Sequence, residues 1–460
     1  MQPALAIAGL TVRAAFRFRL VSVLSVILVG GVVALPLVIK DDGTARGFTQ
    51  ILLTYTLTLI TALLGFATLW LACGTLARDV EEAQIQMVAV KPVARWEIWV
   101  GKLLGILAVD ALLLSVSGLA VFFLLQYRAQ TLPAEQQQVL RNEILVSRGS
   151  ARESIPDYER DVERILQDQL KRAPSQITDV EYIRSQLRER VKAAYQIVPP
   201  GTAREWKIDL GLAKAFLKDR PLYLRAKFNV AQQKPSGTYM GIWVVGGLES
   251  PGAYRPPPMS LAPDTFHEFA IPANLLGPDG SLTIDFINQN ETALLFTIED
   301  GLEVLYREGS FALNFARGMA IIFCWLALLA MLGLASASFL SFPVAAFLSM
   351  AVLVIGLSSG TMSQVIEQGT ILEVNHETGV ADKQAWIDHI ALPVFKSLLK
   401  LINLVQGFSP IDSLSTGRSI TWGQLGLAVA QICLLLGGVF SAIGMYSFQR
   451  RELATAQGNQ

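Results

Sequence analysis

The stretch Arg78–Lys102, RDVEEAQIQMVAVKPVARWEIWVGK, lies between two long apolar runs and decides the fold. The run before it is QILLTYTLTLITALLGFATLWLACG (Gln50–Gly74), and the run after it is LLGILAVDALLLSVSGLAVFFLL (Leu103–Leu125). A helix needs roughly 20 mostly apolar residues to cross the hydrocarbon core of a bilayer. Both runs meet that length, so we expect a membrane protein with a short polar loop between two spans.

The composition of the whole chain agrees with a membrane protein. Of its 460 residues, 52% are hydrophobic and 17% are charged, compared with about 25% charged residues in soluble domains. Lysine and arginine together number 38, as do aspartate and glutamate, and bases alternate with acids along the chain, so we expect no nucleic-acid partner. The three cysteines lie in apolar runs without CxxC spacing, which predicts buried thiols rather than a metal site or disulfides: Cys73, Cys324 and Cys433.

Six apolar segments are long enough to be membrane spans. They lie near 20–39, 50–75, 103–125, 313–339, 342–361 and 424–447. The first segment is too long for a signal peptide and no small-residue cleavage site follows it, so we expect it to stay in the protein as a span.

Basic residues at the chain ends and in the short loops predict the orientation, because such residues stay on the cytoplasmic side. Arginines precede the first span and follow the last, and an even number of spans puts both ends on one side: Arg13, Arg17, Arg19, Arg450 and Arg451. We therefore expect an integral protein of a bacterial inner or plasma membrane, with both termini cytoplasmic and residues 127–311 extracytoplasmic.

One further segment, Ile390–Phe408, is apolar enough to compete for a seventh span. Lys396 and Lys400 lie one helical turn apart within it, and lysines near the bilayer centre are costly. We favour a helix near 386–408 that lies in the outer interface or is partly re-entrant. The alternative is a seventh span, which would place the basic C-terminal end outside.

The polar insert between the third and fourth spans is long enough for a domain of its own. Residues 127–202 are highly charged with apolar positions at helical spacing, which predicts a charged helical segment. Residues 203–311 consist of short alternating stretches separated by Gly, Pro and Asn turns, which predicts a β-sandwich or jelly-roll-like domain. The expected fold is thus an α-helical membrane protein of about six transmembrane helices with a large extracytoplasmic insert, flanked by membrane portions 1–126 and 312–460.

Four aromatic residues of the expected sandwich are candidates for stacking on a ligand such as a sugar ring: Trp206, Tyr223, Trp243 and Tyr254. The stretch AIPANLLGPDGSLTIDFINQN (Ala270–Asn290) resembles the closing strands of carbohydrate-binding-type sandwiches in its alternation of Pro/Gly loop and strand. The alternative is that aromatic residues at alternate strand positions simply form the core.

The sequence contains no recognisable catalytic constellation. It has no GxxxxGK[ST], GxSxG or HExxH motif, so we expect the chain not to be an enzyme and to carry no cofactor or metal of its own. His376 and His389 share a loop with acidic residues but lack the spacing of a metal site. Asp110, inside the third span, is either a functional acid or the partner of a neighbouring helix.

The polar loop itself has an ordered pattern. Its acidic start favours the N-terminal end of a short amphipathic helix, and Pro92 would end that helix. Trp96 and Trp99 suit a membrane interface. With its flanks, the segment 76–102 resembles the loop between the second and third spans in permeases of type-2 ATP-binding-cassette (ABC) exporters, which reads R-[DE]-x-E…K-P-[VI]-x-R-x-E…G-K. The matching residues are Arg78, Asp79, Glu82, Lys91, Pro92, Arg95, Glu97, Gly101 and Lys102.

Other parts of the chain add to this resemblance. A basic amphipathic stretch (Pro3–Arg19) leads into the first span, a small-residue turn (Gly333–Phe347) joins the fourth and fifth, and Tyr446–Leu453 is similar to the family's exit from the last span. The chain departs from the common pattern in its large insert.

The resemblance implies an exporter permease that is energised by a separate ABC ATPase subunit, which binds ATP and Mg and docks on segment 76–102. It also implies a second permease subunit, identical or different, and surrounding membrane lipids. Arg95 and Glu82 are the residues we expect to make charged contacts with the ATPase.

Two other functions agree with the same sequence features. One is a membrane-anchored envelope binding or assembly protein whose sandwich engages a glycan or a protein. The other is a mechanical ABC complex that moves the outward domain. The simplest alternative for segment 76–102 is a loop whose basic residues only follow the orientation rule for membrane proteins and that binds no partner.

Overall fold

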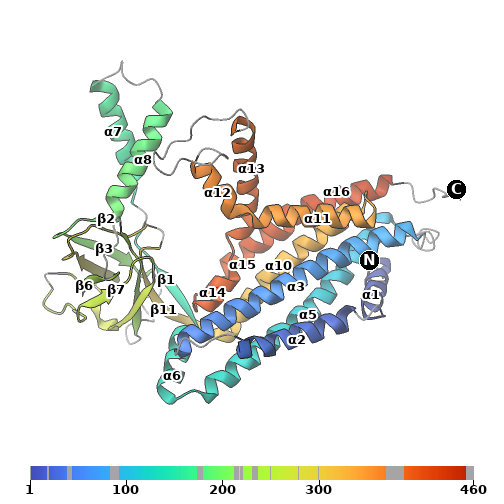
Figure 1. Ribbon diagram of the computed structural model, residues 1–460, viewed down its shortest axis with the longest axis horizontal. Helices are drawn as coiled ribbons and strands as arrows, with labels where there is room; N and C mark the ends of the chain where they lie inside the picture. Colours follow the sequence, from blue (N-terminus) through green and yellow to red (C-terminus); the bar gives the residue numbers. More distant parts are fainter. Residues whose placement is uncertain are drawn as a thin grey trace. The chain divides into compact units, whose positions relative to one another are not determined.

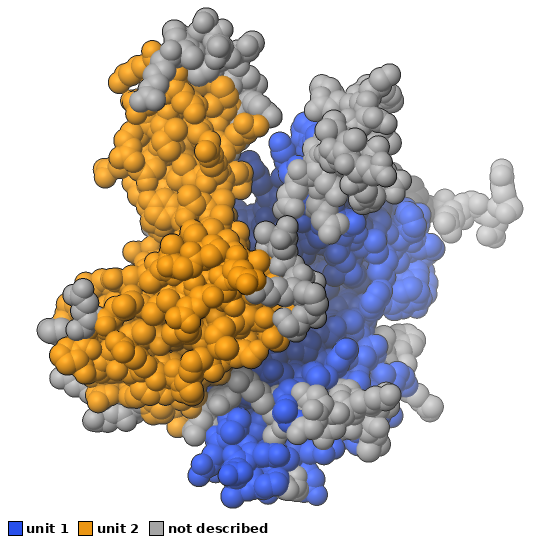
Figure 2. Space-filling view, turned by 60° about the vertical axis from the view of Figure 1, so that its left-hand side comes forward, with its two compact units in different colours: residues 1–147, 309–460 blue, residues 148–308 orange. Residues whose placement is uncertain are grey.

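The computed structural model describes residues 2–17, 20–38, 44–82, 93–154, 156–172, 180–211, 217, 221–230, 237–248, 250–277, 279–298, 300–368 and 388–451. The chain divides into two compact units, which Figure 2 shows in different colours. The helical unit comprises residues 1–147 and 309–460, and the inserted unit comprises residues 148–308.

The helical unit consists of helices on both sides of the insert (Figure 1). Before the insert these are α1 (Gln2–Arg17), α2 (Leu20–Val38), α3 (Ala45–Glu81), α5 (Arg95–Thr131), α6 (Ala134–Val139) and the π-helix η1 (Leu140–Ile144). After it come α10 (Phe311–Ala337), α11 (Phe342–Leu357), α12 (Ser359–Gln368), α13 (Asp388–Gln406), α14 (Pro410–Ser415), α15 (Trp422–Ala428), the π-helix η4 (Val429–Leu436) and α16 (Gly437–Arg450).

Within the described residues, four continuous helical segments are long and apolar enough to cross a membrane: Thr49–Glu81, Arg95–Gln130, Phe311–Ala337 and Trp422–Arg450. These correspond to four of the six expected spans. The other two expected spans correspond to α2, which passes the same test only together with α1 across a bend of 66°, and to α11. α11 has 16 residues, a length of about 24 Å, and falls short of the roughly 30 Å hydrocarbon core. The chain is a membrane protein by these helices, and the six-span count stays a prediction.

α10 is the central helix of this unit. It contacts α3, α5, α11 and α16, and many of its residues are buried. Gly333 allows one of these approaches, because a Cβ atom there would lie 2.7 Å from the Cβ of Ala72 on α3. Large apolar side chains on the outer helices remain exposed, such as Phe123 and Phe347, as expected for helices that face lipid.

α13 covers the segment expected near 386–408 and is not among the four spanning segments. Ile390, Val394 and Leu401 on this helix are exposed apolar residues. Lys396 and Lys400 are also exposed. An interfacial position for α13 is compatible with this pattern and stays a prediction.

The inserted unit contains two four-stranded sheets. One has the order β1 (Val146–Ala151), β11 (Leu302–Ser310), β4 (Leu222–Ala226), β8 (His267–Ile271), and the other has the order β3 (Ala203–Asp209), β9 (Ser281–Ile287), β6 (Tyr239–Val245), β7 (Met259–Leu261). A small third sheet pairs β2 (Ile197–Val198), β10 (Leu294–Leu295) and β5 (Asn229–Val230), and a short turn η3 (Ala273–Leu275) precedes β9. Alternate residues of both large sheets share one hydrophobic cluster, which is the arrangement of a sandwich.

The boundaries within the insert differ from those expected. The charged helices α7 (Tyr158–Arg172) and α8 (Val180–Gln196) form a hairpin around a small apolar cluster. They follow β1, however, and β1 lies beside β11 in a sheet of the sandwich. Residues 127–131 continue α5 instead of belonging to the insert. The sandwich is therefore not confined to 203–311, because a strand distant in sequence completes one of its sheets.

The aromatic candidates for ligand stacking lie mostly in the core. Trp206 is 4% exposed and Trp243 is 1% exposed, and both pack against Phe296. Tyr223 and Tyr254 are half-buried, and Tyr254 packs against the same core cluster. The buried rings of the two tryptophans cannot stack on an external ligand, so the stacking expectation is corrected for them in favour of the core alternative.

Candidate functional site

The candidate site is the end of the helical unit where α3 ends and α5 begins. Of the nine motif residues predicted from the sequence, Lys91 and Pro92 lie outside the described residues. The other seven lie on the last turns of α3 or the first turns of α5, or directly next to them. Their side chains can therefore be followed one by one.

Asp79 and Lys102 join the two helices. The Lys102 ammonium donates to Asp79 Oδ2 at 2.5 Å and to the Thr75 carbonyl at 2.6 Å. The Lys102 side chain is only 7% exposed, and that of Asp79 is 35% exposed. An ammonium this deeply buried needs such partners, so this pair of motif residues holds the ends of α3 and α5 together.

Arg95 reaches the end of α16 instead of the surface. Its Nη1 atom donates to the carbonyls of Gln449 at 2.7 Å and Arg451 at 2.8 Å, with a longer contact to Phe448. The last carbonyls of a helix have no partner within the helix and carry partial negative charge. The guanidinium of Arg95 satisfies them, and so attaches the start of α5 to the end of the last span.

The end of α10 is bound to the same place. Arg451 donates to the carbonyls of Ala337 at 3.0 Å and Ser338 at 3.2 Å. The indole of Trp99, buried on α5, donates to the Ser338 hydroxyl at 3.2 Å. Trp99 therefore lies inside the bundle, in contrast to the interfacial position expected from the sequence.

α3 is also attached to the start of α11. Glu81 accepts a hydrogen bond from the Phe342 amide at 2.8 Å, which satisfies one of the free amides at that helix start. The guanidinium of Arg78 lies 4.5 Å from the centre of the Phe342 ring, and Trp70 packs edge-to-face on the same ring.

Two further motif residues shape α5 and its contact with α1. Glu97 accepts a hydrogen bond from the Ala94 amide at 3.3 Å and so caps α5. Gly101 lies under α1, where a Cβ atom would be 2.7 Å from the Ala4 carbonyl oxygen. Gly105, one turn further on, is similarly close to the Ala8 carbonyl oxygen, at 2.9 Å. The amphipathic N-terminal helix thus packs directly on the first turns of α5.

These contacts form one connected set, which we call the helix-end network: Arg78, Asp79, Glu81, Arg95, Trp99, Lys102, Ser338, Phe342 and Arg451. It links the ends of α3, α5, α10, α11 and α16. Four members of this network belong to the sequence motif: Arg78, Asp79, Arg95 and Lys102. The motif did not predict that these residues contact one another's helices. Glu81 and Arg451 were not predicted as site residues, although each is a charged residue close to the end of an apolar run, and this position could have identified them.

Several described residues at this end have exposed side chains. Arg78, Glu81 and Glu82 are exposed, and Trp96 is 45% exposed. They flank residues 83–92 on both sides.

Asp110 lies deeper in the bundle. Its Oδ1 atom accepts a hydrogen bond from the Thr68 hydroxyl of α3 at 2.8 Å, while its buried Oδ2 atom has no partner among the described residues. The contact with a neighbouring helix was one of the two roles expected for this acid.

The histidines form no candidate centre in the part of the chain that the structure describes. His267 contacts the Ala262 carbonyl at 2.8 Å, His376 lies outside the described residues, and no group of three or more possible metal ligands occurs among those described. Comparisons with protein-family models, with curated proteins and with solved structures find no match to the chain.

Proposed function

We propose that the chain is the permease subunit of an ABC-type exporter and that a separate ATPase subunit docks on segment 76–102. The observation that carries this proposal is the helix-end network. A force applied to the loop between α3 and α5 would reach the four spanning segments and α11 directly, because their ends are tied by hydrogen bonds and an ion pair at one place. A loop whose basic residues only set the orientation of the spans would not need hydrogen bonds and ion pairs between the helix ends.

The geometry divides the residues at this end of the helical unit into two roles. Arg95, Asp79 and Lys102 are engaged within the chain and would transmit movement. Arg78, Glu82 and Trp96 are exposed beside the loop and would contact the ATPase. Arg95 therefore moves from the expected docking contacts to the transmitting residues. ATP and Mg would be bound by the partner, and two permease subunits would form the pathway.

Charge reversal tests the two roles separately. We expect Glu82→Lys to reduce the ATPase that co-purifies with the chain from its native membranes. Glu135→Lys, on an exposed position of α6, is the matched control and should leave co-purification unchanged. Arg95→Glu should retain the ATPase but lose transport-coupled hydrolysis, since a carboxylate would face the carbonyls at the end of α16.

Two results would contradict the proposal. One is the recovery of no P-loop ATPase with the wild-type chain after mild cross-linking. The other is equal co-purification by the Glu82 and Glu135 variants together with unchanged hydrolysis in the Arg95 variant.

A mechanical ABC complex would use the same network with the inserted unit as its moving part. It would retain both variant effects and differ in its output, the displacement of the inserted unit without transfer of a substrate. A spin-label distance within reconstituted complexes, measured with and without ATP, distinguishes it from an exporter.

A further inference from the structure

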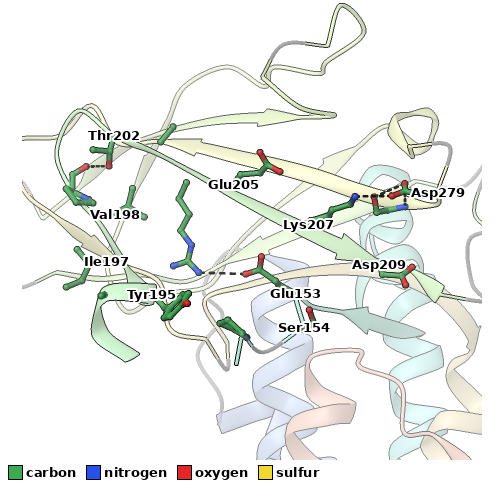
Figure 3. Close-up of a pocket in the computed structure, with 16 residues that line it drawn as sticks. Glu153, Ser154, Tyr195, Ile197, Val198, Thr202, Glu205, Lys207, Asp209 and Asp279 are labelled. Carbon is green, nitrogen blue, oxygen red and sulfur yellow. Dashed lines mark hydrogen bonds and ion pairs between the residues drawn. The ribbon is translucent and has the colours of Figure 1, made fainter. Parts of the chain in front are cut away.

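A groove of about 910 Å³ lies on the inserted unit along strand β3 (Figure 3). This volume is within the roughly 300–1,000 Å³ of ligand-binding clefts. Alternate residues of β3, including Glu205, Lys207 and Asp209, line one side. The other side comes from Glu153, after β1, and from Tyr195, at the end of α8.

β3 is the edge strand of its sheet. The Thr283 carbonyl of β9 accepts a hydrogen bond from the Gly246 amide, directly after β6, at 2.8 Å. The backbone groups of Thr283 therefore point away from β3. Lys207 stands opposite Thr283, and in an antiparallel ladder such a pair exchanges no hydrogen bonds. The backbone N–H and C=O of Lys207 therefore point into the groove, and by the same two-residue period so do those of Glu205 and Asp209.

One of these backbone groups lies near a carboxylate. The Lys207 amide favours the charged form of the Glu153 carboxyl and so opposes the rise of its pKa that burial causes. This influence agrees with the outward direction of the amide. The Glu153 carboxylate also protects the edge from unspecific pairing, as charged side chains on edge strands commonly do.

The groove carries an excess of negative charge. Lys207 pairs with Asp279 at 3.0 Å, and Arg204 pairs with Glu153 at 3.8 Å. Glu205 and Asp209 are exposed and have no ion pair within the described part of the chain. They lie about 13 Å apart along the strand, at about 3.3 Å per residue.

We propose that the edge of β3 binds an extended basic segment of a partner protein as an additional antiparallel strand. The outward backbone groups would supply the main-chain hydrogen bonds of strand addition, and a carbonyl of the added strand would take the place of the Glu153 carboxylate at the Lys207 amide. Basic residues opposite Glu205 and Asp209 would meet the two carboxylates, and an uncharged residue would stand opposite Lys207. Trp206 on the same strand is buried in the core and offers no stacking surface to a sugar in this groove.

The probe that fits this pattern is a fluorescein-labelled peptide, Val-Lys-Val-Thr-Val-Lys-Val, titrated against the full chain in detergent micelles by fluorescence anisotropy. Its Lys and Thr residues would face β3 with their amides, and its Val amides would point away. N-methylation of the Lys and Thr amides should therefore abolish binding, while N-methylation of the internal Val amides should change it less than about threefold. A peptide with Glu in place of both Lys residues should bind at least about tenfold more weakly.

Variants of the chain complete the test. Glu205→Gln should weaken binding of the basic peptide and reduce its salt dependence, and Glu205→Pro should abolish binding because it removes a groove-facing amide that does not pair with β9. Glu189→Gln, on exposed α8, is the matched control and should bind like the wild type. Absence of binding up to millimolar peptide, or equal binding of both N-methylated forms, would overturn the proposal. Neither result depends on an ATPase, so this test is independent of the proposed transport function.

Discussion

The ion pair between Asp79 and Lys102 allows a quantitative test of the helix-end network. The two partners differ in burial, since the Lys102 side chain is 7% exposed and the Asp79 side chain is 35% exposed. Removal of one partner from a buried pair costs about 3–5 kcal/mol, because the remaining charge stays buried. The cost must therefore depend on which partner is removed.

Asp79→Asn would leave a buried ammonium with the Thr75 carbonyl as its remaining charge-compensating contact. We expect it to destabilise the helical unit by about 3 kcal/mol. Lys102→Met keeps the length of the side chain and leaves a carboxylate that water can reach, so we expect a loss of about 1 kcal/mol. The double variant Asp79→Asn with Lys102→Met should lie close to the Lys102 single variant, which gives a coupling energy of about 3 kcal/mol.

The assay is thermal unfolding of the purified chain in detergent, followed by tryptophan fluorescence. The expected order of melting temperatures is wild type, then Lys102→Met together with the double variant, then Asp79→Asn. Glu135→Gln serves as the control for an exposed charge and should match the wild type. Equal losses in the two single variants, or a double variant as unstable as their sum, would refute the structural role. In that case the pair would be better explained as two independent surface charges available to a partner.

Three other changes test different parts of the structure. Gly101→Ala should displace α1 from α5 and lower stability by about 1–3 kcal/mol, whereas Gly9→Ala should not, because a Cβ atom at Gly9 has open space. Maleimide labelling of a cysteine introduced into the buried face of α1 measures the displacement, and equal labelling in both variants would contradict it. Trp243→Ala should lower the stability of the inserted unit by about 3–5 kcal/mol. Met240→Ala, at an exposed position on the same strand, should lower it by less than about 0.5 kcal/mol. Limited proteolysis measures both effects, and a Trp243 variant as resistant as the wild type would contradict its role in the core. Burial, and the like charge of Glu205 on the neighbouring strand, raise the pKa of Asp285 above its usual value of 3.8. Between the pKa of the unfolded state and that of the folded state, only the folded protein keeps this proton, so stability falls as pH rises through this range. Asp285→Asn should thus raise the melting temperature at pH 7 but not at pH 4, and an equal gain at both pH values would show that its charge is not the cause.

Sequence patterns were sufficient to predict the elements of this fold that depend on composition. Long apolar runs predicted the spanning helices α3, α5, α10 and the α15–α16 segment, because the length needed to cross a bilayer is a property of the run itself. Alternation between turn residues predicted a sheet domain after residue 203, since side chains on a strand alternate between its two faces. The charged helical hairpin was predicted in the same way from its 3.6-residue period.

The sequence misplaced features that depend on contacts between distant segments. Nothing in residues 127–202 predicted that β1 pairs with β11. The two strands are separated by about 150 residues, and pairing over such a distance leaves no pattern in the local sequence. Trp99 and Trp206 had the amphipathic character of interface or ligand residues, and only their neighbours decide that both are buried.

For the candidate site, the sequence by itself determined which residues are present at the end of α3 and the start of α5, and that this loop has a specific charged pattern. Only the tertiary structure decided what those charges do. Arg95 satisfies carbonyls of a helix more than 350 residues away, and Lys102 is buried against α3. The physical reason is that a long basic side chain can equally well be solvated or satisfy a helix end, and the choice depends on which helix end folding brings within its reach.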